Sequence, residues 1–302
     1  MPNIELINQE FNELRYNRRH IDGYIREAIE ADAYMAGKIN QGIDYLNQWM
    51  AIDYYPSKNA RLAQLKGMDL RQLVTDIFVG VAYYQREELF TSVTAQMSGR
   101  LRFSDRVEAI TTLAEIMAVL CQTDAFDILK ATKMSSLVVV SRIPLSEKIL
   151  RFIEESQYLP PMVCEPRKLV NNFSSGYLTH SDSLILGSGN HHDGDICLDV
   201  LNIMNKVPLK LCTDLLCQEE ESPTFALDDG DKRQQWHQFK KQSYRFYELL
   251  VHQGNRFYLT HKVDKRGRIY AQGYHISTQG AAFKKAMIEL ADEEIVEGVP
   301  GF

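Results

Sequence analysis

Apolar residues recur at helical spacing over the first 130 residues of the chain. Asn3 is suited to cap a helix N-terminus, and four large apolar residues follow it at steps of three and four: Ile4, Ile7, Phe11 and Leu14. A second stripe repeats the spacing at Ile21, Ile25, Ile29 and Ala33, and the segments 70–90 and 106–126 continue it. We therefore expect a domain of amphipathic helices whose apolar faces pack against one another.

Strand-like and irregular segments follow this helical part. The β-branched run SSLVVVSRIPL at 135–145 predicts a short strand, and helical spacing returns in LSEKILRFIEE at 145–155. Residues 160–194 are rich in Pro, Gly, Ser, Asn and His, with a second strand-like patch in SLILG at 183–187. This composition predicts an irregular connector between two domains.

Two further helices are expected beyond the connector. The segment 195–218 has helical spacing that Pro208 disturbs. The segment 231–253 carries one apolar stripe, made of Trp236, Phe239, Phe246, Leu249 and Leu250. Its other side is polar and mostly basic, with Arg233, His237, Lys240, Lys241 and Tyr244. Two helices joined by a loop, one with a basic face, predict a projecting arm.

Composition places the chain among ordinary globular proteins. It has 302 residues, 45% of them apolar, and no apolar run approaches the roughly 18 residues of a membrane-spanning helix. The N-terminus lacks the cations and the apolar segment of a signal peptide, so we expect a cytoplasmic protein without a membrane partner. Five cysteines without a CxxC pair predict reduced structural thiols.

The charge is unevenly distributed along the chain. The net charge is -6, yet the segment 231–268 holds ten Lys or Arg residues against three Asp or Glu residues. A local basic stripe of this kind is what a polyanionic partner requires. Its densest part is DKRGR at 264–268, which stands between two short strand-like runs.

DKRGR admits two interpretations. In the first it is only a solvated hairpin turn, which Asp264 opens and in which Gly267 supplies a positive φ or a bulge. In the second, Arg266 and Arg268 alternate to one side and converge with the basic helix on a nucleic-acid backbone, because arginine forks bind phosphate bidentately.

A histidine-rich loop offers a different chemistry. GSGNHHDGD at 187–195 contains His191, His192, Asp193 and Asp195, which could serve as metal ligands or as the His–Asp pair of a metal phosphohydrolase. A cation needs ligands that converge from rigid elements, whereas three glycines in nine residues indicate a polar loop. We expect no metal site there. Neither a phosphate-binding glycine loop nor a set of serine, histidine and carboxylate stands out.

The C-terminal part resembles a known family. FYLTHKVDKRGRIY followed by YHISTQGAAFKKAMIELADEEIVEG is similar to the start of the palm in phage-type single-subunit RNA polymerases, a family that includes mitochondrial RNA polymerase. The matching positions are Asp264, Arg266, Gly267, Arg268, Tyr270, Gln279, Gly280, a helix from Ala281 to Ala291, and Gly298. Thinner similarity extends back to LPPMVCEPRKLVNNFSSGYL and DVLNIMNKVPLKL.

The resemblance implies a fold and roles for residues. The fold would be mainly α with minor β: an N-terminal helical domain with its connector (1–194), a helical thumb (195–254), and a hairpin plus helix that begin the palm (255–302). Arg266 and Arg268 would hold backbone phosphates, Gly267 would permit close approach, and Tyr270 would pack beneath the RNA:DNA hybrid. The basic surface would extend over Lys262, Lys265, Lys240, Lys241 and Arg233, while Asp264, Gln279 and Gly280 would shape the motif.

The resemblance also implies that the chemistry lies elsewhere. In the family, the palm carboxylates that hold two metal ions, and the fingers residues, follow the segment at which this sequence ends. We therefore expect no catalytic residue, metal or cofactor in this chain, and Mg²⁺ in a partner. An artificial fragment would fit, but we favour a naturally split enzyme, because the sequence resembles the N-terminal subunit of the split RNA polymerase of enquatrovirus-type phages.

The partners implied by a split enzyme are a catalytic C-terminal subunit in a heterodimer, template DNA, the RNA:DNA hybrid, and a phage factor that binds single-stranded DNA or opens promoters. The location implied is the cytoplasm of an infected bacterium. The alternative is a stand-alone accessory protein that binds single-stranded nucleic acid.

Overall fold

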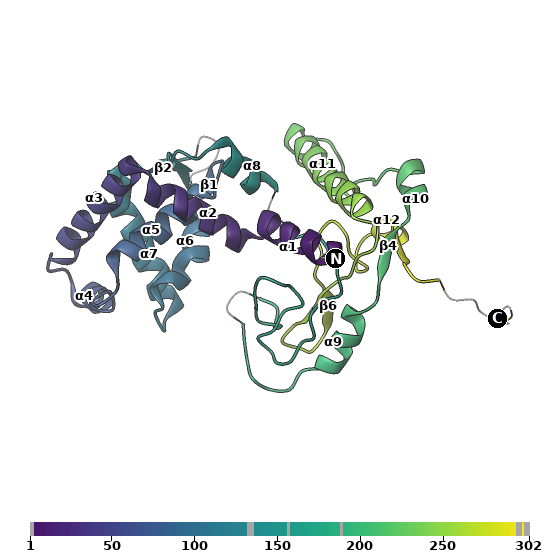
Figure 1. Ribbon diagram of the computed structural model, residues 1–302. Helices are drawn as coiled ribbons and strands as arrows, with labels where there is room; N and C mark the ends of the chain where they lie inside the picture. The colour runs from purple at the N-terminus through teal and green to yellow at the C-terminus, as the bar shows by residue number, and fades with distance from the viewer. Residues whose placement is uncertain (1–2, 132–135, 156–157, 188–189, 294–297, 299–302) are drawn as a thin grey trace. The chain divides into compact units, whose positions relative to one another are not determined.

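The computed structural model describes residues 3–131, 136–155, 158–187, 190–293 and 298. Its described part is mainly α-helical with small antiparallel sheets, as expected (Figure 1). The internal contacts divide the chain into two compact units, one of residues 18–154 and one that joins residues 1–17 to residues 155–302. The helix at the N-terminus thus belongs to the same unit as the C-terminal half. The domain boundaries at 194 and 254, which the resemblance implies, stay predictions.

The unit 18–154 is built around a helical core. Its helices are α2 (Arg18–Ala31), α3 (Ala33–Met50), α4 (Pro56–Ala63), α5 (Leu70–Ala82), α6 (Phe90–Met97), α7 (Arg106–Leu120) and α8 (Glu147–Glu155), with 3-10 turns η1 (Ser98–Leu101) and η2 (Cys121–Thr123). Asp32, Asp69 and Asp105 cap α3, α5 and α7 by accepting backbone N–H groups. Three members of the predicted stripe, Ile21, Ile25 and Ile29, are buried in this core, whereas the fourth, Ala33, begins α3 and is exposed.

A three-stranded sheet completes this unit. Its antiparallel order is β1 (Glu88–Leu89), β3 (Leu137–Ser141) and β2 (Phe126–Lys130). The strand predicted in 135–145 is confirmed over the residues of β3. We did not predict β2, because its partner lies across a separate loop and local spacing carries no signal of that pairing.

The second unit contains the connector and four elements of the predicted arm. Residues 158–187 and 190–197 are largely irregular. The predicted strand at 183–187 is reduced to one isolated bridge between Ile185 and Val263. The elements that follow are α9 (Leu198–Asn205), β4 (Leu209–Leu211), α10 (Thr213–Gln218) and α11 (Gly230–His252). The helix expected over 195–218 is therefore interrupted by a strand, which begins after Pro208, a residue without a backbone N–H.

The helix predicted from Ala281 to Ala291 also differs from the structure. Instead of one helix from Ala281 to Ala291, the structure has α12 (Ala282–Ala286) followed by β7 (Ile288–Leu290). β7 pairs antiparallel with β4, with Leu209 opposite Leu290 and Leu211 opposite Ile288. A distant strand thus takes the hydrogen bonds that would otherwise extend the helix. None of the described helices is long and apolar enough to cross a membrane.

The helix α1 (Ile4–Tyr16) buries the face opposite to the one that we expected. Asn3 caps it as predicted, since its side chain accepts the backbone N–H of Glu5 at 3.0 Å. The apolar stripe, however, faces solvent: Ile4, Ile7 and Phe11 are 65%, 47% and 56% exposed. The prediction that this stripe packs against other helices was wrong.

The opposite, polar face of α1 is the buried one. The Glu13 carboxylate accepts the backbone N–H groups of Leu178 and Thr179, both at 2.8 Å, and Gln9 accepts the backbone N–H of Val163 at 2.8 Å. Unpaired backbone groups of the irregular connector need such partners, because burying them without a hydrogen bond is costly. The polar face of α1 is therefore buried against the connector, because it supplies the acceptors that the backbone N–H groups of the connector need.

Candidate nucleic-acid interface

The DKRGR segment forms the turn of a hairpin. Its strands are β5 (His261–Val263) and β6 (Ile269–Ala271), with Val263 opposite Ile269. The Gly267 N–H donates to the Asp264 carbonyl, and the Asp264 N–H donates to the Arg268 carbonyl, both at 2.9 Å. Gly267 has a φ of 80°, in the left-handed region that glycine adopts without strain. The turn and the positive φ predicted for DKRGR are both present.

Asp264 organises the turn from within. Its Oδ1 accepts the backbone N–H groups of Arg266 (2.9 Å) and Arg268 (3.0 Å), and its Oδ2 accepts Arg268 Nε at 2.7 Å. Desolvation acts to raise the pKa of Asp264, but the hydrogen bonds from Arg268 and from Arg266 outweigh it and lower that pKa to about 2. The carboxylate therefore stays ionised and holds the hairpin turn at neutral pH.

The cations of the hairpin differ in their freedom. Arg268 forms an ion pair with Asp264, with Nη2 at 2.6 Å from Oδ2, although 59% of its side chain stays exposed. Lys265 and Arg266 are exposed at the tip, and neither forms an ion pair with any residue that the structure describes. The tip thus presents one preorganised guanidinium and two cations that can reorient toward a ligand.

One face of the hairpin collects three of the predicted residues. Lys262 lies directly across the ladder from Tyr270, which places both side chains on the same face of the sheet. The Arg268 guanidinium lies 5.8 Å from the centre of the Tyr270 ring. Lys262 Nζ lies 2.9 Å from Asp182 Oδ2, so this ammonium is partly neutralised.

Gln279 and Gly280 support the hairpin from outside. The Gln279 side-chain amide donates to the Ile269 carbonyl at 3.1 Å and accepts the Ala271 N–H at 2.9 Å, so it occupies the free edge of β6 as a strand would. A Cβ on Gly280 would lie 3.0 Å from Lys284 Cδ, a tight contact that favours glycine. In this structure Gln279 therefore braces the edge of the hairpin, while the motif role of Gly280 stays a prediction.

The cations of α11 contact another segment. Arg233 Nη1 donates to the Leu227 carbonyl at 3.0 Å, and Lys240 pairs with Glu220, while Lys241 is exposed. Ala271 of β6 packs against the apolar cluster that contains Phe246 and Leu250 of α11, on the side of that helix opposite to its cations. The structure thus brings together Lys262, Arg268 and Tyr270, and places the basic residues of α11 on a separate element.

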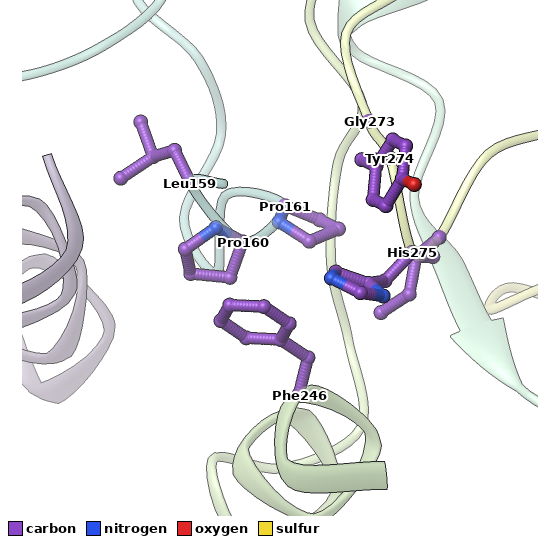
Figure 2. A pocket seen from close by; sticks show the side chains of 8 residues that line it. Leu159, Pro160, Pro161, Phe246, Gly273, Tyr274 and His275 are labelled. Carbon is purple, nitrogen blue, oxygen red and sulfur yellow. The ribbon is translucent and has the colours of Figure 1, made fainter. Parts of the chain in front are cut away.

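The apolar face of α11 packs on the loop that follows the hairpin. Phe246 is buried, and its ring centre lies 5.3 Å from that of His275. Figure 2 shows the rings of Phe246, Tyr274 and His275 arranged with Pro160 and Pro161 around one pocket. This aromatic cluster holds the helix against the segment that carries the hairpin.

His275 is the titratable group of that cluster, and sequence reasoning missed it. Burial, together with the nearby charge of Lys284, lowers the pKa of His275 to about 4. Its Nδ1 lies 2.7 Å from the Ser243 hydroxyl, and its buried Nε2 has no hydrogen-bond partner within the described part of the chain. His275 is therefore neutral at physiological pH. The signal in the sequence that could have drawn attention to His275 was its position two residues before the STQG stretch.

The histidine-rich loop does not form a metal site in the described residues. His191 Nε2 lies 3.2 Å from Asp193 Oδ1, and Asn172 donates to the carbonyls of His192 and Gly194. Across the ranges that the structure describes, which leave out 188–189 in this loop, no group of three or more His, Cys, Asp or Glu residues could hold a metal ion. The geometry gives the phosphohydrolase alternative no support.

Comparison with known proteins relates part of the chain to an RNA polymerase. No protein-family model matches the chain. A probable DNA-directed RNA polymerase from Gelasinospora sp. (strain G114) is 28% identical over 144 residues, which cover 43% of this chain and 17% of that protein. The match thus spans a small part of the relative's length. At this level the sequence is related to DNA-directed RNA polymerases.

Proposed function

We propose that this chain is the nucleic-acid-gripping, N-terminal subunit of a two-subunit phage DNA-directed RNA polymerase. It would hold template DNA and the RNA:DNA hybrid in the cytoplasm of an infected bacterium. The proposal is supported by the similarity to an RNA polymerase and by the hairpin that presents Lys265, Arg266 and Arg268. Under this proposal the thumb is 195–254 and the palm begins at 255.

The observation that carries the proposal is the construction of the hairpin tip. Asp264 consumes two N–H donors of Arg268 and fixes the direction of its guanidinium, whose other donors remain available. Arg266 keeps its donors for a ligand, and Gly267 adds no side chain between backbone and ligand. A guanidinium held in place loses little entropy when it binds phosphate, so this arrangement favours a polyanion backbone.

We propose that the chemistry belongs to a partner polypeptide. Nucleotidyl transfer by two metal ions requires carboxylates that converge on both ions. Such a cluster is not found among the residues described here. The partner would supply these carboxylates, the bound Mg²⁺ and the fingers, while a phage factor that binds single-stranded DNA or opens promoters would prepare the template.

The test measures binding of a fluorescein-labelled RNA:DNA hybrid by anisotropy over a range of salt concentrations. Arg266→Ala should weaken binding and reduce the slope of log K against log salt by about one, the value for one lost phosphate contact. Arg86→Ala removes an exposed arginine of the other unit and is the matched control. Equal slopes for both variants would refute the proposed grip.

Co-purification separates this function from that of a stand-alone binding protein. A second chain recovered in equal amount, with paired palm carboxylates in its sequence and template-directed RNA synthesis in the complex, supports the polymerase subunit. Single-stranded nucleic-acid binding by a chain that forms no such complex favours the accessory role.

A further inference from the structure

The connector exposes two apolar side chains that the proposed function leaves unexplained. Val170 and Phe173 are 72% and 53% exposed, whereas Leu169 and Ser174 on either side of them are buried. We call residues 169–174 the connector loop. Single exposed apolar residues are common on protein surfaces, so a role for Phe173 requires evidence that the fold presents it to a ligand.

Hydrogen bonds fix the backbone of the connector loop. The Ser174 hydroxyl accepts the backbone N–H groups of Val170 and Asn171, at 3.3 and 3.1 Å, and Asn171 Oδ1 accepts that of Phe173 at 2.9 Å. The buried Asn172 donates its side-chain amide to two carbonyls of the histidine-rich loop, at 2.8 and 2.7 Å. The backbone that carries Phe173 is thus held before any ligand binds, which lowers the entropy cost of binding.

The ring of Phe173 keeps a face open. His191 packs on it in a T-shaped contact, with ring centres 5.6 Å apart and planes at 89°. Such a contact covers at most one face of the phenylalanine, and more than half of the residue stays exposed. The other face can therefore stack on a planar group.

The connector loop lies near the DKRGR hairpin in the same compact unit. The Leu184 N–H donates to the Asn172 carbonyl at 2.8 Å, and the Leu184 carbonyl accepts the Val263 N–H at 2.9 Å. Segments joined in this way lie roughly 5 Å apart. Two such steps, plus one residue of chain at each end, place Phe173 and Asp264 less than about 20 Å apart.

The uncompensated charge around the connector loop and the hairpin is positive. Lys168 directly precedes the loop and is exposed, and Arg167 before it donates to the Leu178 carbonyl at 2.8 Å. Among the described residues, the exposed cations here without an ion pair are Arg167, Lys168, Lys265 and Arg266, against exposed carboxylates at Asp193 and Asp195. A polyanion suits this surface better than an acceptor for acidic or neutral protein segments would.

The apolar area of the connector loop is small. Two exposed side chains of this kind present roughly 200 Å² together, well below the ~800 Å² per partner of a standard protein interface. A nucleobase is planar and needs only one aromatic ring, and base–aromatic stacking is typical of proteins that bind single strands. Bases within a hybrid are already stacked and paired, so an accessible base must be unpaired.

We infer that Phe173 stacks on an unpaired base of the nucleic acid whose backbone the hairpin holds. This inference rests on the proposed function, in which the hairpin supplies the phosphate contacts. At 3.4 Å per nucleotide of a stacked strand, a separation under about 20 Å corresponds to about six nucleotides. The base would therefore lie within about six nucleotides of the held phosphate, where a strand leaves the hybrid.

The first test compares two fluorescein-labelled RNA:DNA hybrids by anisotropy, one blunt and one with a single-stranded template extension at each end. Phe173→Ala should weaken binding of the extended hybrid by about 5- to 150-fold, the effect of one lost base–aromatic stack, and leave the blunt hybrid unchanged. The slope of log K against log salt should not change, because a stacked ring releases no counterions. Phe173→Tyr should keep the affinity, whereas Phe173→Leu, which has no ring, should not.

Phe11→Ala is the matched control for this test. Phe11 is 56% exposed on α1 of the same unit, so both substitutions remove a phenylalanine that already contacts water, and both should keep the melting temperature. Equal affinities of the two variants for the extended hybrid would overturn the inference. So would an equal loss for the blunt and the extended hybrid.

A photochemical test locates the contact. 5-Iodouracil, placed at successive positions of the extensions, forms adducts with aromatic side chains on which it stacks, and mass spectrometry of the digested adduct identifies the residue. We expect Phe173 in an adduct from a position within about six nucleotides of the hybrid. Adducts confined to other residues would contradict the inference. A Phe173→Ala chain that binds both hybrids normally but no longer recovers a second polypeptide would show a protein contact instead.

Failure of the proposed function has a separate signature. In that case Arg266→Ala and Arg86→Ala have equal salt slopes, whatever Phe173 contributes to the extended hybrid. If Arg266→Ala lowers the slope but Phe173→Ala binds the extended hybrid as the unchanged chain does, only the stacking contact is refuted.

Discussion

Gly267→Ala tests whether the hairpin turn needs its left-handed residue. Gly267 has a φ of 80°, and an added Cβ would meet no atom within 4 Å, so the substitution introduces no clash. The expected cost is therefore the backbone strain alone, roughly 1–2 kcal/mol for a residue with a side chain in this region. In a unit of this size, that corresponds to a fall in melting temperature of about 2–8 °C if the unit unfolds cooperatively.

The matched control for this variant is Gly230→Ala. Gly230 also has open space around its Cβ, but it begins α11 and has no positive φ. Alanine there should be neutral or slightly stabilising, because it reduces the entropy of the unfolded chain. The assay is thermal unfolding by circular dichroism, with hydrogen exchange of β5 and β6 to locate the effect. Equal melting temperatures for the two variants, with unchanged exchange in the hairpin, would refute the reasoning.

Three further predictions concern other parts of the second unit. The pKa of His275 is about 4 in the folded chain and 6.5 in the unfolded chain, so between these pH values the unfolded state binds more protons. The free energy of unfolding should therefore fall by about 3 kcal/mol as the pH drops from 6.5 to 4. Denaturant titrations at several pH values should show a smaller loss for His275→Gln. Gln279→Ala should cost about 1 kcal/mol and speed hydrogen exchange at the Ala271 amide, whereas unchanged exchange would contradict its role at the strand edge. Glu13→Ala removes the carboxylate that accepts the Leu178 and Thr179 amides and should destabilise the second unit by roughly 3 kcal/mol. The loss should exceed that of Glu10→Ala, at an exposed position of the same helix, as measured by urea unfolding.

Local sequence signals predicted the elements that depend on local chemistry. The hairpin turn followed from Asp264 and Gly267, since a three-residue turn needs a left-handed residue and a side chain that accepts nearby amides. Helix α2 followed from its isoleucine stripe, and α1 began at Asn3 as its capping side chain required. The helical spacing of the first 130 residues agreed with the fold class that the resemblance implied, mainly α with minor β.

Local sequence signals could not predict the elements that depend on distant segments of the chain. β7 was predicted as helix because only its pairing with β4 supplies the hydrogen bonds of a strand. The role of Gln279 at the edge of β6 and the desolvation of His275 also arise from residues brought together by folding. Spacing along a chain reports which residues can share a face, but it does not report what that face meets.

The sequence by itself determined that α1 is an amphipathic helix, that DKRGR is a tight basic turn, and that the chain is related to RNA polymerases. Only the tertiary structure decided which face of α1 is buried and which cation of the turn is held by Asp264. The physical reason is the same in both cases. Buried backbone amides and ionised groups must be paired, and the pairing that satisfies them can outweigh the preference of an apolar stripe for the interior.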